Sequence, residues 1–342
     1  MSEKSTVAVY GAYGHTGRFV VNELHRRGFR TILSARGEGH GPAEESAGPR
    51  TEIRIASVET PGELDSAISG ASAVINCAGP FIDTAVPLVE AAIRARIPYV
   101  DIAAEQPSVA TVFGEFSRTA AEARVVVTPA MGFYGALGDV LATAAMRDWA
   151  SADDVSIAVA LDSWHPTRGT RRTGERNAGT RLILTHGALE RMDPPPGPPW
   201  TFPPPFGLQE VVGLALSETI LISRHLRVAE VRGFLNRAPL RDLLDPATPA
   251  PVPSDKLGRS SQVFVMEVVV RNGSQQRRTV ARGQDIYAVT APIAVEAVER
   301  IVAGRASGVG VLAAGEAFDA TDFLGALQSS YPGLEIRGVP FE

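Results

Sequence analysis

Three glycines near the start of the chain have the spacing of a loop that binds a phosphate. Gly11, Gly14 and Gly17 follow a short apolar run, and a segment with apolar residues at helical spacing comes directly after them. Glycines at these places allow a sharp turn, a close approach of the backbone to a ligand, and tight packing of a helix on a strand. The first N–H groups of the helix and the positive end of its dipole then face the anion. The segment therefore predicts a dinucleotide-binding turn.

The end of the second expected strand, residues 31–35, indicates which dinucleotide is bound. Folds specific for NAD usually carry Asp or Glu there, whereas this strand ends in Ser34 and Ala35 and is followed by Arg36. A guanidinium can bind a 2′-phosphate through two parallel hydrogen bonds, and the serine hydroxyl can donate as well. We therefore predict NADP(H) as the cofactor, and a solvated Arg36 is the alternative.

The other cofactor contacts are expected from the glycine turn and from the loop after the fourth strand, residues 73–77, which should border the nicotinamide half of the crevice. The predicted cofactor-binding residues are Gly11, Tyr13, Gly14, His15, Thr16, Gly17, Ser34, Ala35, Arg36, Asn76, Cys77, Ala78, Gly79 and Phe81. Cys77 has no His or Lys beside it in the sequence. We therefore interpret it as a small buried side chain, with a catalytic thiol as the alternative.

Acid–base chemistry has two principal candidates, Tyr134 and Asp101, with Glu105 as a third. Tyr134 follows the sixth strand and could give a proton to a reduced carbon or nitrogen, or its ring could simply pack at the start of a helix. Asp101 ends the fifth strand, where a hydrogen-bonding brace is the alternative to catalysis. The only lysines are Lys4 and Lys256, and no tyrosine has a lysine four residues later. A Tyr-x-x-x-Lys reductase couple is thereby excluded.

Apolar runs and helical spacing predict the elements that must position these residues. Strands are expected at 7–10, 31–35, 52–56, 73–77, 98–102 and 124–128, and helices at 18–24, 61–68, 84–95 and 107–123. This alternation predicts a Rossmann domain with a parallel sheet, over residues 1–134.

The second half of the chain has a different pattern. Strands are expected at 155–161, 227–233, 262–271 and 277–282, the last two joined by a hairpin turn at Asn272-Gly273. Helices are expected at 135–149, 291–303 and 319–329, and the Pro-rich segment 194–206 is expected to be an extended surface loop. We predict an α+β substrate or dimerisation domain with a mostly antiparallel sheet at 135–288. Residues 289–342 are expected to form C-terminal helices that pack back on the Rossmann domain.

Composition excludes several classes of protein. A net charge of −5 with dispersed basic residues argues against nucleic-acid binding. The longest apolar-leaning run, 211–222, contains Ser217, Glu218 and Thr219 and is too short and too polar to span a bilayer. One cysteine allows no internal disulfide, and no histidine pair has metal-ligand spacing, so we predict no metal site. We expect a cytoplasmic protein.

Several segments together resemble the saccharopine dehydrogenase-like NAD(P)-binding oxidoreductases, which include proteins similar to trans-acting enoyl reductases. The matching segments are GAYGHTG (11–17), VINCAGPF (74–81), YVDIAAE (99–105), PAMGFYGALGDVLA (129–142), residues 285–291 and residues 308–318. The chain departs from the family pattern at Ala56 and Ala104. The resemblance implies an NADPH-bound reductase that acts on C=N or conjugated C=C bonds.

The predicted function is therefore an NADP-dependent oxidoreductase that transfers a hydride to a C=C or C=N bond of a small biosynthetic intermediate. The alternative is a non-catalytic NADP-binding sensor or regulatory protein. The Arg- and Thr-rich segment 164–181 could hold an acidic or carrier-bound substrate, or could be a solvated loop. A homodimer is a further expectation for the second domain.

Overall fold

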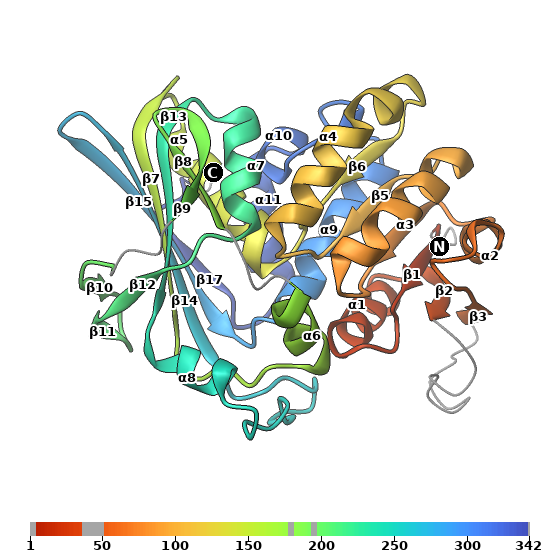
Figure 1. Cartoon of the computed structure of the whole chain (residues 1–342), viewed down its shortest axis with the longest axis horizontal. Helices are drawn as coiled ribbons and strands as arrows, with labels where there is room; N and C mark the ends of the chain where they lie inside the picture. Colours follow the sequence, from red (N-terminus) through yellow and green to blue (C-terminus); the bar gives the residue numbers. More distant parts are fainter. Residues whose placement is uncertain (1–4, 36–50, 177–180, 193–196, 341–342) are drawn as a thin grey trace. The chain divides into compact units, whose positions relative to one another are not determined.

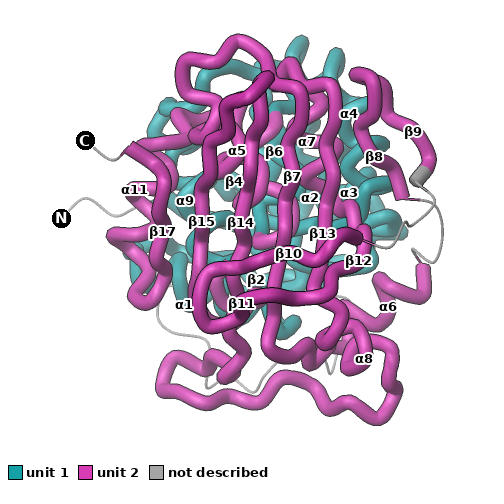
Figure 2. Tube along the Cα trace, turned by 90° about the vertical axis from the view of Figure 1, so that its left-hand side faces the viewer, with its two compact units in different colours: residues 1–132, 290–312 teal, residues 133–289, 313–342 magenta. Residues whose placement is uncertain are grey.

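The structure is a computed structural model that describes residues 5–35, 51–176, 181–192 and 197–340. Its chain divides into two units, each built from two separate stretches of sequence. Unit 1 contains residues 1–132 and 290–312, and unit 2 contains residues 133–289 and 313–342 (Figure 2). The expected boundary near residue 134 lies close to the first of these divisions. The tail differs from the expectation, because only residues 290–312 of it belong to unit 1.

The described part of unit 1 contains a seven-stranded parallel sheet in the order β16-β6-β5-β4-β1-β2-β3. The strands are β1 (Thr6–Tyr10), β2 (Arg30–Ala35), β3 (Thr51–Ile55), β4 (Ala73–Asn76), β5 (Tyr99–Asp101), β6 (Val126–Thr128) and β16 (Gly310–Val311). The helices are α1 (His15–Arg26), α2 (Pro61–Ile68), α3 (Phe81–Ala95), α4 (Gln106–Glu122) and α9 (Thr290–Val302). The first six strands follow the 3-2-1-4-5-6 order of a dinucleotide-binding fold.

Helices cover both faces of this sheet, which is why its central strands are apolar along their whole length. Helices α2, α3 and α4 pack against one another, while α1 packs against α9 (Figure 1). Every residue of β4 is buried, as is every residue of β5. The strand order reverses between β1 and β4, so the carboxyl ends of these two strands form the topological switch point of the sheet.

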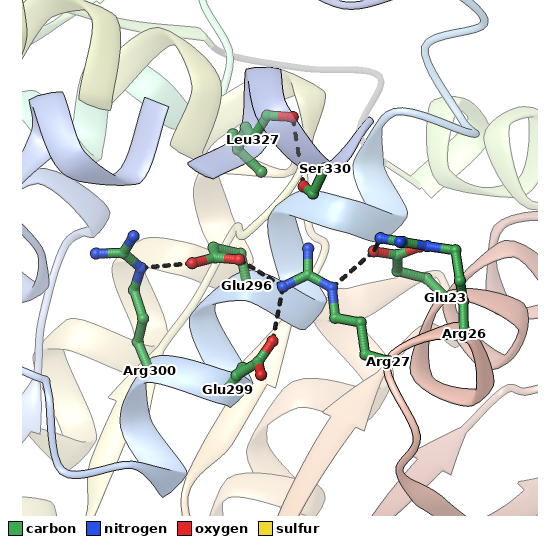
Figure 3. A network of polar contacts seen from close by, with 8 residues as sticks. All are labelled: Glu23, Arg26, Arg27, Glu296, Glu299, Arg300, Leu327 and Ser330. Carbon is green, nitrogen blue, oxygen red and sulfur yellow. Dashed lines mark hydrogen bonds and ion pairs between the residues drawn. The ribbon is translucent and has the colours of Figure 1, made fainter. Parts of the chain in front are cut away.

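A buried charge network joins the two separate stretches of unit 1 (Figure 3). The guanidinium of Arg27, at the end of α1, pairs with Glu23 at 2.7 Å, with Glu299 at 2.9 Å and also with Glu296. Arg300 pairs with Glu296 at 2.8 Å on the other side. Burial alone would lower the pKa of Arg27, but the three carboxylates raise it, so the cation is firmly held. The network fixes α1, the helix that begins at the glycine turn, to α9.

Unit 2 is built on a second, mixed sheet with β17-β15-β14-β7-β13-β8-β9 as its main order and β12 paired to β13. Its strands are β7 (Ala152–Leu161), β8 (Arg181–Thr185), β9 (Ala188–Met192), β12 (Val211–Gly213), β13 (Val228–Asn236), β14 (Val263–Asn272), β15 (Gln275–Gln284) and β17 (Glu335–Arg337). Only the β7–β13 pair is parallel among the described strands of this sheet. The predicted α/β class with a mostly antiparallel second sheet is therefore confirmed.

The helical segments of unit 2 are η2 (Phe133–Leu137), α5 (Gly138–Met146), α6 (Arg168–Arg176), α7 (Ser217–His225), α8 (Ala238–Leu244), α10 (Ala314–Ala317) and α11 (Ala320–Ser330). The backbone is not helical at Tyr134 and Gly135 within η2, and Gly135 has a φ of 108° that favours glycine. The segment expected to be one helix from 135 to 149 is thus a kinked turn followed by α5.

A small hairpin of β10 (Trp200–Phe202) and β11 (Gly207–Gln209) crosses one face of the second sheet (Figure 2). Phe202 packs with Phe234 and Val265 of the sheet, and the Trp200 indole donates to the buried Glu267 carboxylate at 2.6 Å. The described part of the Pro-rich segment therefore contains a short strand instead of being loop throughout. Residues 193–196 lie outside the described part.

Candidate cofactor site and a polar pair in unit 2

The glycine turn between β1 and α1 is so closely packed that side chains do not fit at two of its positions. A Cβ at Gly17 would lie 2.3 Å from the carbonyl oxygen of Gly11. Gly11 has a φ of 78°, and a Cβ there would lie 2.8 Å from Ala78, in the loop after β4. The turn and this loop are therefore in contact at the carboxyl edge of the sheet, as the sequence predicts for a dinucleotide crevice.

The first turn of α1 is arranged to receive an anion. Its N-cap is Gly14, which has no side chain to accept hydrogen bonds from the first helical N–H groups. The next helix at the same sheet edge, α3, is different, because the Glu105 carboxylate accepts from the N–H groups of Phe81 and Ile82, both at 2.9 Å. A phosphate is thus favoured at the N-terminus of α1, where no carboxylate competes for the helix dipole.

Two buried hydroxyls near the turn fit a nucleotide. The oxygens of Ser34, near the end of β2, and of Tyr13, in the turn, are inaccessible and have no hydrogen-bond partner among the described residues. Buried hydroxyls of this kind generally have a partner, which a bound nucleotide would supply. His15 and Thr16 begin α1, and the His15 ring contacts Phe19 edge-on. Ala35 ends β2, and the predicted phosphate-binding residue Arg36 lies outside the described residues.

Hydrogen bonds from buried side chains shape the loop after β4. Asn76 accepts from the Ala78 N–H at 3.0 Å and donates to the hydroxyls of Thr84 and Tyr99 at 3.0 and 3.1 Å. Tyr99 in turn donates to Asp101 at 2.9 Å. Asn76 is fully buried, so its side chain holds the loop rather than presenting itself to solvent. The loop places Ala78 against Gly11 of the glycine turn, with Cys77 before it and Gly79 and Phe81 after it in the chain.

Asp101 connects this network to the loop after β6. Its carboxylate also accepts from the N–H groups of Ala103 and Ala130, at 3.0 and 2.7 Å, and its side chain is fully buried. Burial raises the pKa of Asp101 to about 6, although these hydrogen bonds act in the opposite direction. Both carboxylate oxygens accept hydrogen bonds from the protein. This is the arrangement expected if Asp101 acts as a hydrogen-bonding brace and not as a catalytic group. Burial likewise raises the pKa of the Cys77 thiol, which keeps it protonated.

Tyr134 belongs to unit 2 and lies in an aromatic and polar cluster there. Its ring stacks on Trp164 with centroids 5.9 Å apart, and the Trp164 indole donates to the Tyr287 hydroxyl at 3.0 Å. The Tyr134 hydroxyl is inaccessible and has no partner within the described part of the chain. Burial, with smaller effects of Glu218 and Tyr287, holds its pKa well above the usual value.

Glu218, on α7, is the residue of this cluster that the sequence did not single out as a site. Its side chain is 3% exposed, and its Oε2 has no partner among the described residues. Burial raises the pKa of Glu218 to about 7, while the N–H groups of Glu218, Leu216 and Gly135 and the charge of Arg181 act against the shift. The available signal was a carboxylate inside the apolar-leaning run 211–222.

A protein-family model matches most of the first stretch of unit 1. Residues 7–128 match the family model of the saccharopine dehydrogenase NADP binding domain. This part of the chain is similar to the saccharopine dehydrogenase NADP-binding domain. The resemblance seen in the sequence and the prediction of NADP(H) as cofactor are thereby confirmed. The glycine turn, β1 to β6 and α1 to α4 all lie within or at the ends of the matched segment.

Curated relatives match a little over a third of this chain. Saccharopine dehydrogenase-like oxidoreductase of Mus musculus is 26% identical over 145 residues, which cover 37% of this chain and 34% of the relative. The Bos taurus protein of the same description is 25% identical over 149 residues, with the same coverage of both chains. The matched part therefore spans about a third of the length of these relatives.

A solved structure is similar in fold over nearly the whole chain. Apo saccharopine dehydrogenase (L-Glu forming) from Saccharomyces cerevisiae superimposes with a TM-score of 0.67 over 98% of this chain and 99% of the other. The identity is 12%, so the likeness is one of fold. Among the residues that the structure describes, no helix has the length and apolar character needed to cross a membrane. The same residues contain no cluster of three or more His, Cys, Asp or Glu side chains suited to hold a metal ion.

Proposed function

We propose that this protein is an NADPH-dependent reductase that transfers a hydride to a C=C or C=N bond of a small biosynthetic intermediate. The observation that carries the proposal is the uncapped first turn of α1, which meets a glycine cradle at the carboxyl edge of an NADP-binding domain. NADPH, when bound, supplies the hydride. The chain itself must bind the cofactor, fix the loops around it and place a proton donor.

The binding role falls to the residues of the turn and the two neighbouring strand ends. The N–H groups of His15, Thr16 and Gly17 start α1 and would hold the pyrophosphate. Ser34, together with the predicted Arg36, would hold the 2′-phosphate. Asn76 and Glu105 keep the loop 77–82 in place from behind, through its backbone N–H groups.

Tyr134 is the proton donor that we propose. Its raised pKa keeps the hydroxyl protonated at neutral pH, as a donor requires, and the hydroxyl has no described partner to occupy it. Asp101 was the second principal catalytic candidate predicted from the sequence. Because both of its oxygens accept hydrogen bonds, we propose that Asp101 acts as a positioning residue for the loops after β5 and β6.

An acidic or carrier-linked substrate is supported by α6. This helix carries Arg168, Arg172 and Arg176 one turn apart, and all three are exposed. On its other side, Thr170 contacts the Tyr287 hydroxyl at 3.0 Å, and Tyr287 in turn contacts the ring that stacks on Tyr134. A phosphate or carboxylate handle could therefore bind to the helix that flanks this aromatic cluster.

The test compares cofactor binding with turnover. Calorimetry on the purified chain should show NADPH bound more tightly than NADH, and Arg36→Ala should weaken NADPH binding far more than NADH binding. Arg30→Ala, at the opposite end of β2, is the matched control and should leave both affinities unchanged. Oxidation of NADPH is then followed with 2-cyclohexen-1-one as a C=C substrate and 1-pyrroline as a C=N substrate. Tight binding without oxidation of NADPH by any candidate substrate would instead support a sensor.

A further inference from the structure

The strongest unassigned feature of unit 2 is a pair of buried oxygen atoms without partners on adjoining segments. The Tyr134 hydroxyl lies in η2, and the Glu218 carboxyl lies on α7, which packs against η2. The stem of Glu218 lies over the start of α5, where a Cβ at Gly138 would be 3.3 Å from the Glu218 Cβ. Helix α7, which carries Glu218, therefore contacts both η2, which carries Tyr134, and the start of α5.

Each of the two side chains has one oxygen atom without a hydrogen-bond partner among the described residues, and a ligand could bind to it. Oε1 of Glu218 accepts from the N–H of Leu216 at 3.3 Å, whereas Oε2 has no partner among the described residues. The ring of Tyr134 is fixed between Phe133, at 4.9 Å edge-on, and Trp164, at 5.9 Å. Fixed orientation matters because a hydroxyl that is already aimed loses little freedom when it donates to a ligand.

Both groups are donors in their neutral forms, and burial favours the neutral forms. Burial raises the pKa of Glu218 to about 7 and holds that of Tyr134 far above neutrality. The other titratable groups that act on the pair are Arg181 on β8 and Tyr287. Arg181 is itself desolvated, which lowers its pKa, and it makes no hydrogen bond or ion pair to a described residue. The site thus offers a phenol, a carboxylic acid and a nearby cation.

We infer that Tyr134 and Glu218 form an oxyanion site that binds the carbonyl oxygen of a conjugated, α,β-unsaturated carbonyl substrate. The inference rests on the proposed function and narrows it to C=C reduction. A tyrosine and a protonated carboxylic acid that together receive a dienolate oxygen are known from ketosteroid isomerase. An imine substrate would need no second neutral donor of this kind.

The reaction balances with the residues named. NADPH, when bound, would supply the hydride that bonds to the β-carbon and would leave as NADP⁺, while the C=C electron pair shifts to the α-carbon and carbonyl. The negative charge that develops on the oxygen is held by the hydrogen bonds from Tyr134 and Glu218. A proton from solvent or from Tyr134 then bonds to the α-carbon and gives the saturated carbonyl compound.

The test uses a probe that needs no turnover. Pentafluorophenolate, an aromatic oxyanion that stays ionised at neutral pH, is titrated into the full chain with NADP⁺ present and followed by ¹⁹F NMR. It should bind, whereas pentafluoroanisole, in which the oxygen is methylated, should bind at least about tenfold more weakly. Affinity for the phenolate should fall by about tenfold per pH unit above about 7, as Glu218 ionises and repels the probe.

Two variants assign the effect to the pair. Tyr134→Phe should weaken phenolate binding by about tenfold or more at every pH. Glu218→Gln keeps a donor but cannot ionise, so its affinity should no longer fall as the pH rises. Tyr331→Phe and the exposed Glu210→Gln, both in unit 2, are matched controls and should resemble the unchanged chain. Urea unfolding and far-UV circular dichroism, measured on every variant, show that each one is folded independently of cofactor binding.

The outcomes separate this inference from the proposed function. Lack of phenolate binding, an unaltered affinity in Tyr134→Phe or an unaltered pH dependence in Glu218→Gln overturns the oxyanion site. Reduction of 1-pyrroline without reduction of 2-cyclohexen-1-one also overturns it, while the reductase proposal stands. Phenolate binding as predicted in a chain that does not bind NADPH supports the site and overturns the proposed function.

Discussion

Gly17 provides a decisive test of the cofactor site, because two effects of opposite sign compete there. Alanine is favoured over glycine by about 1 kcal/mol within a helix, so helix propensity alone predicts that Gly17→Ala stabilises the protein. The structure predicts the reverse, because the new Cβ would lie 2.3 Å from the Gly11 carbonyl oxygen and 3.0 Å from two backbone atoms of Ala12. These are backbone atoms, so relief requires the whole turn to move.

The size of the effect follows from the displacement. Ordinary contact begins at 3.4 Å, so the turn must open by about 1 Å. The loss of a hydrogen bond to a charged phosphate costs about 1.5–3 kcal/mol, which at its upper end is about 100-fold in affinity. We expect NADPH affinity to fall by about that factor, or about 2.7 kcal/mol, as measured by calorimetry. The control is Gly114→Ala on α4, where a Cβ meets nothing within 4 Å. It should raise the free energy of unfolding by about 0.5–1 kcal/mol and leave NADPH affinity unchanged. An unchanged NADPH affinity in Gly17→Ala would refute the role of the glycine turn in binding the cofactor.

Three further predictions concern buried charges. Arg27→Gln removes the cation shared by three carboxylates, of which Glu23 keeps Arg26 and Glu296 keeps Arg300 as a partner. The variant should destabilise unit 1 by about 3 kcal/mol in urea unfolding. Arg118→Gln, in an exposed pair, should cost under about 1 kcal/mol. Glu105→Gln removes one of the two acceptors at the start of α3 and should cost about 1–2 kcal/mol. His225 pairs with the buried Asp139 at 2.7 Å; burial would lower its pKa, but Asp139 raises it overall. The stability lost in His225→Gln should therefore be largest below about pH 6 and shrink as the pH rises past the raised pKa. A loss that does not change with pH would contradict this.

Local signals were enough to predict much of the first unit. Helix α2 begins at Pro61 and ends at Ile68 as expected, because proline at the first helical position marks a helix start. The helix expected at 319–329 corresponds to α11, which begins at Ala320 because the Asp319 side chain accepts from the N–H of Asp322 as its N-cap. The central strands of the first sheet, such as β1 and β4, could be predicted because strands buried on both faces are continuous apolar runs.

The missed features depend on partners that are distant in the sequence. Strand β16 has only two residues and exists because it pairs with β6, some 180 residues earlier. Helix α6 has no buried residue, so no apolar periodicity marks it. Likewise, the capping role of Glu105 depends on N–H groups 23 and 24 residues away. The tail differs from the expectation for the same reason, since β17 pairs with β15 of the second sheet.

The interrupted layout of the NADP-binding domain has a consequence for its synthesis. Its first stretch ends at residue 132, but α9 and β16 arrive only by residue 312, which is 312 − 132 = 180 residues later. At about 5–20 residues per second, a ribosome needs roughly 10–40 s to make this interval. During that time the newly made polypeptide has an open edge at β6 and an arginine at the end of α1 that still awaits two of its three carboxylates. Maturation of unit 1 is therefore coupled to synthesis of the chain as far as residue 312, and a product that terminates before α9 would leave this unit without its last helix and strand.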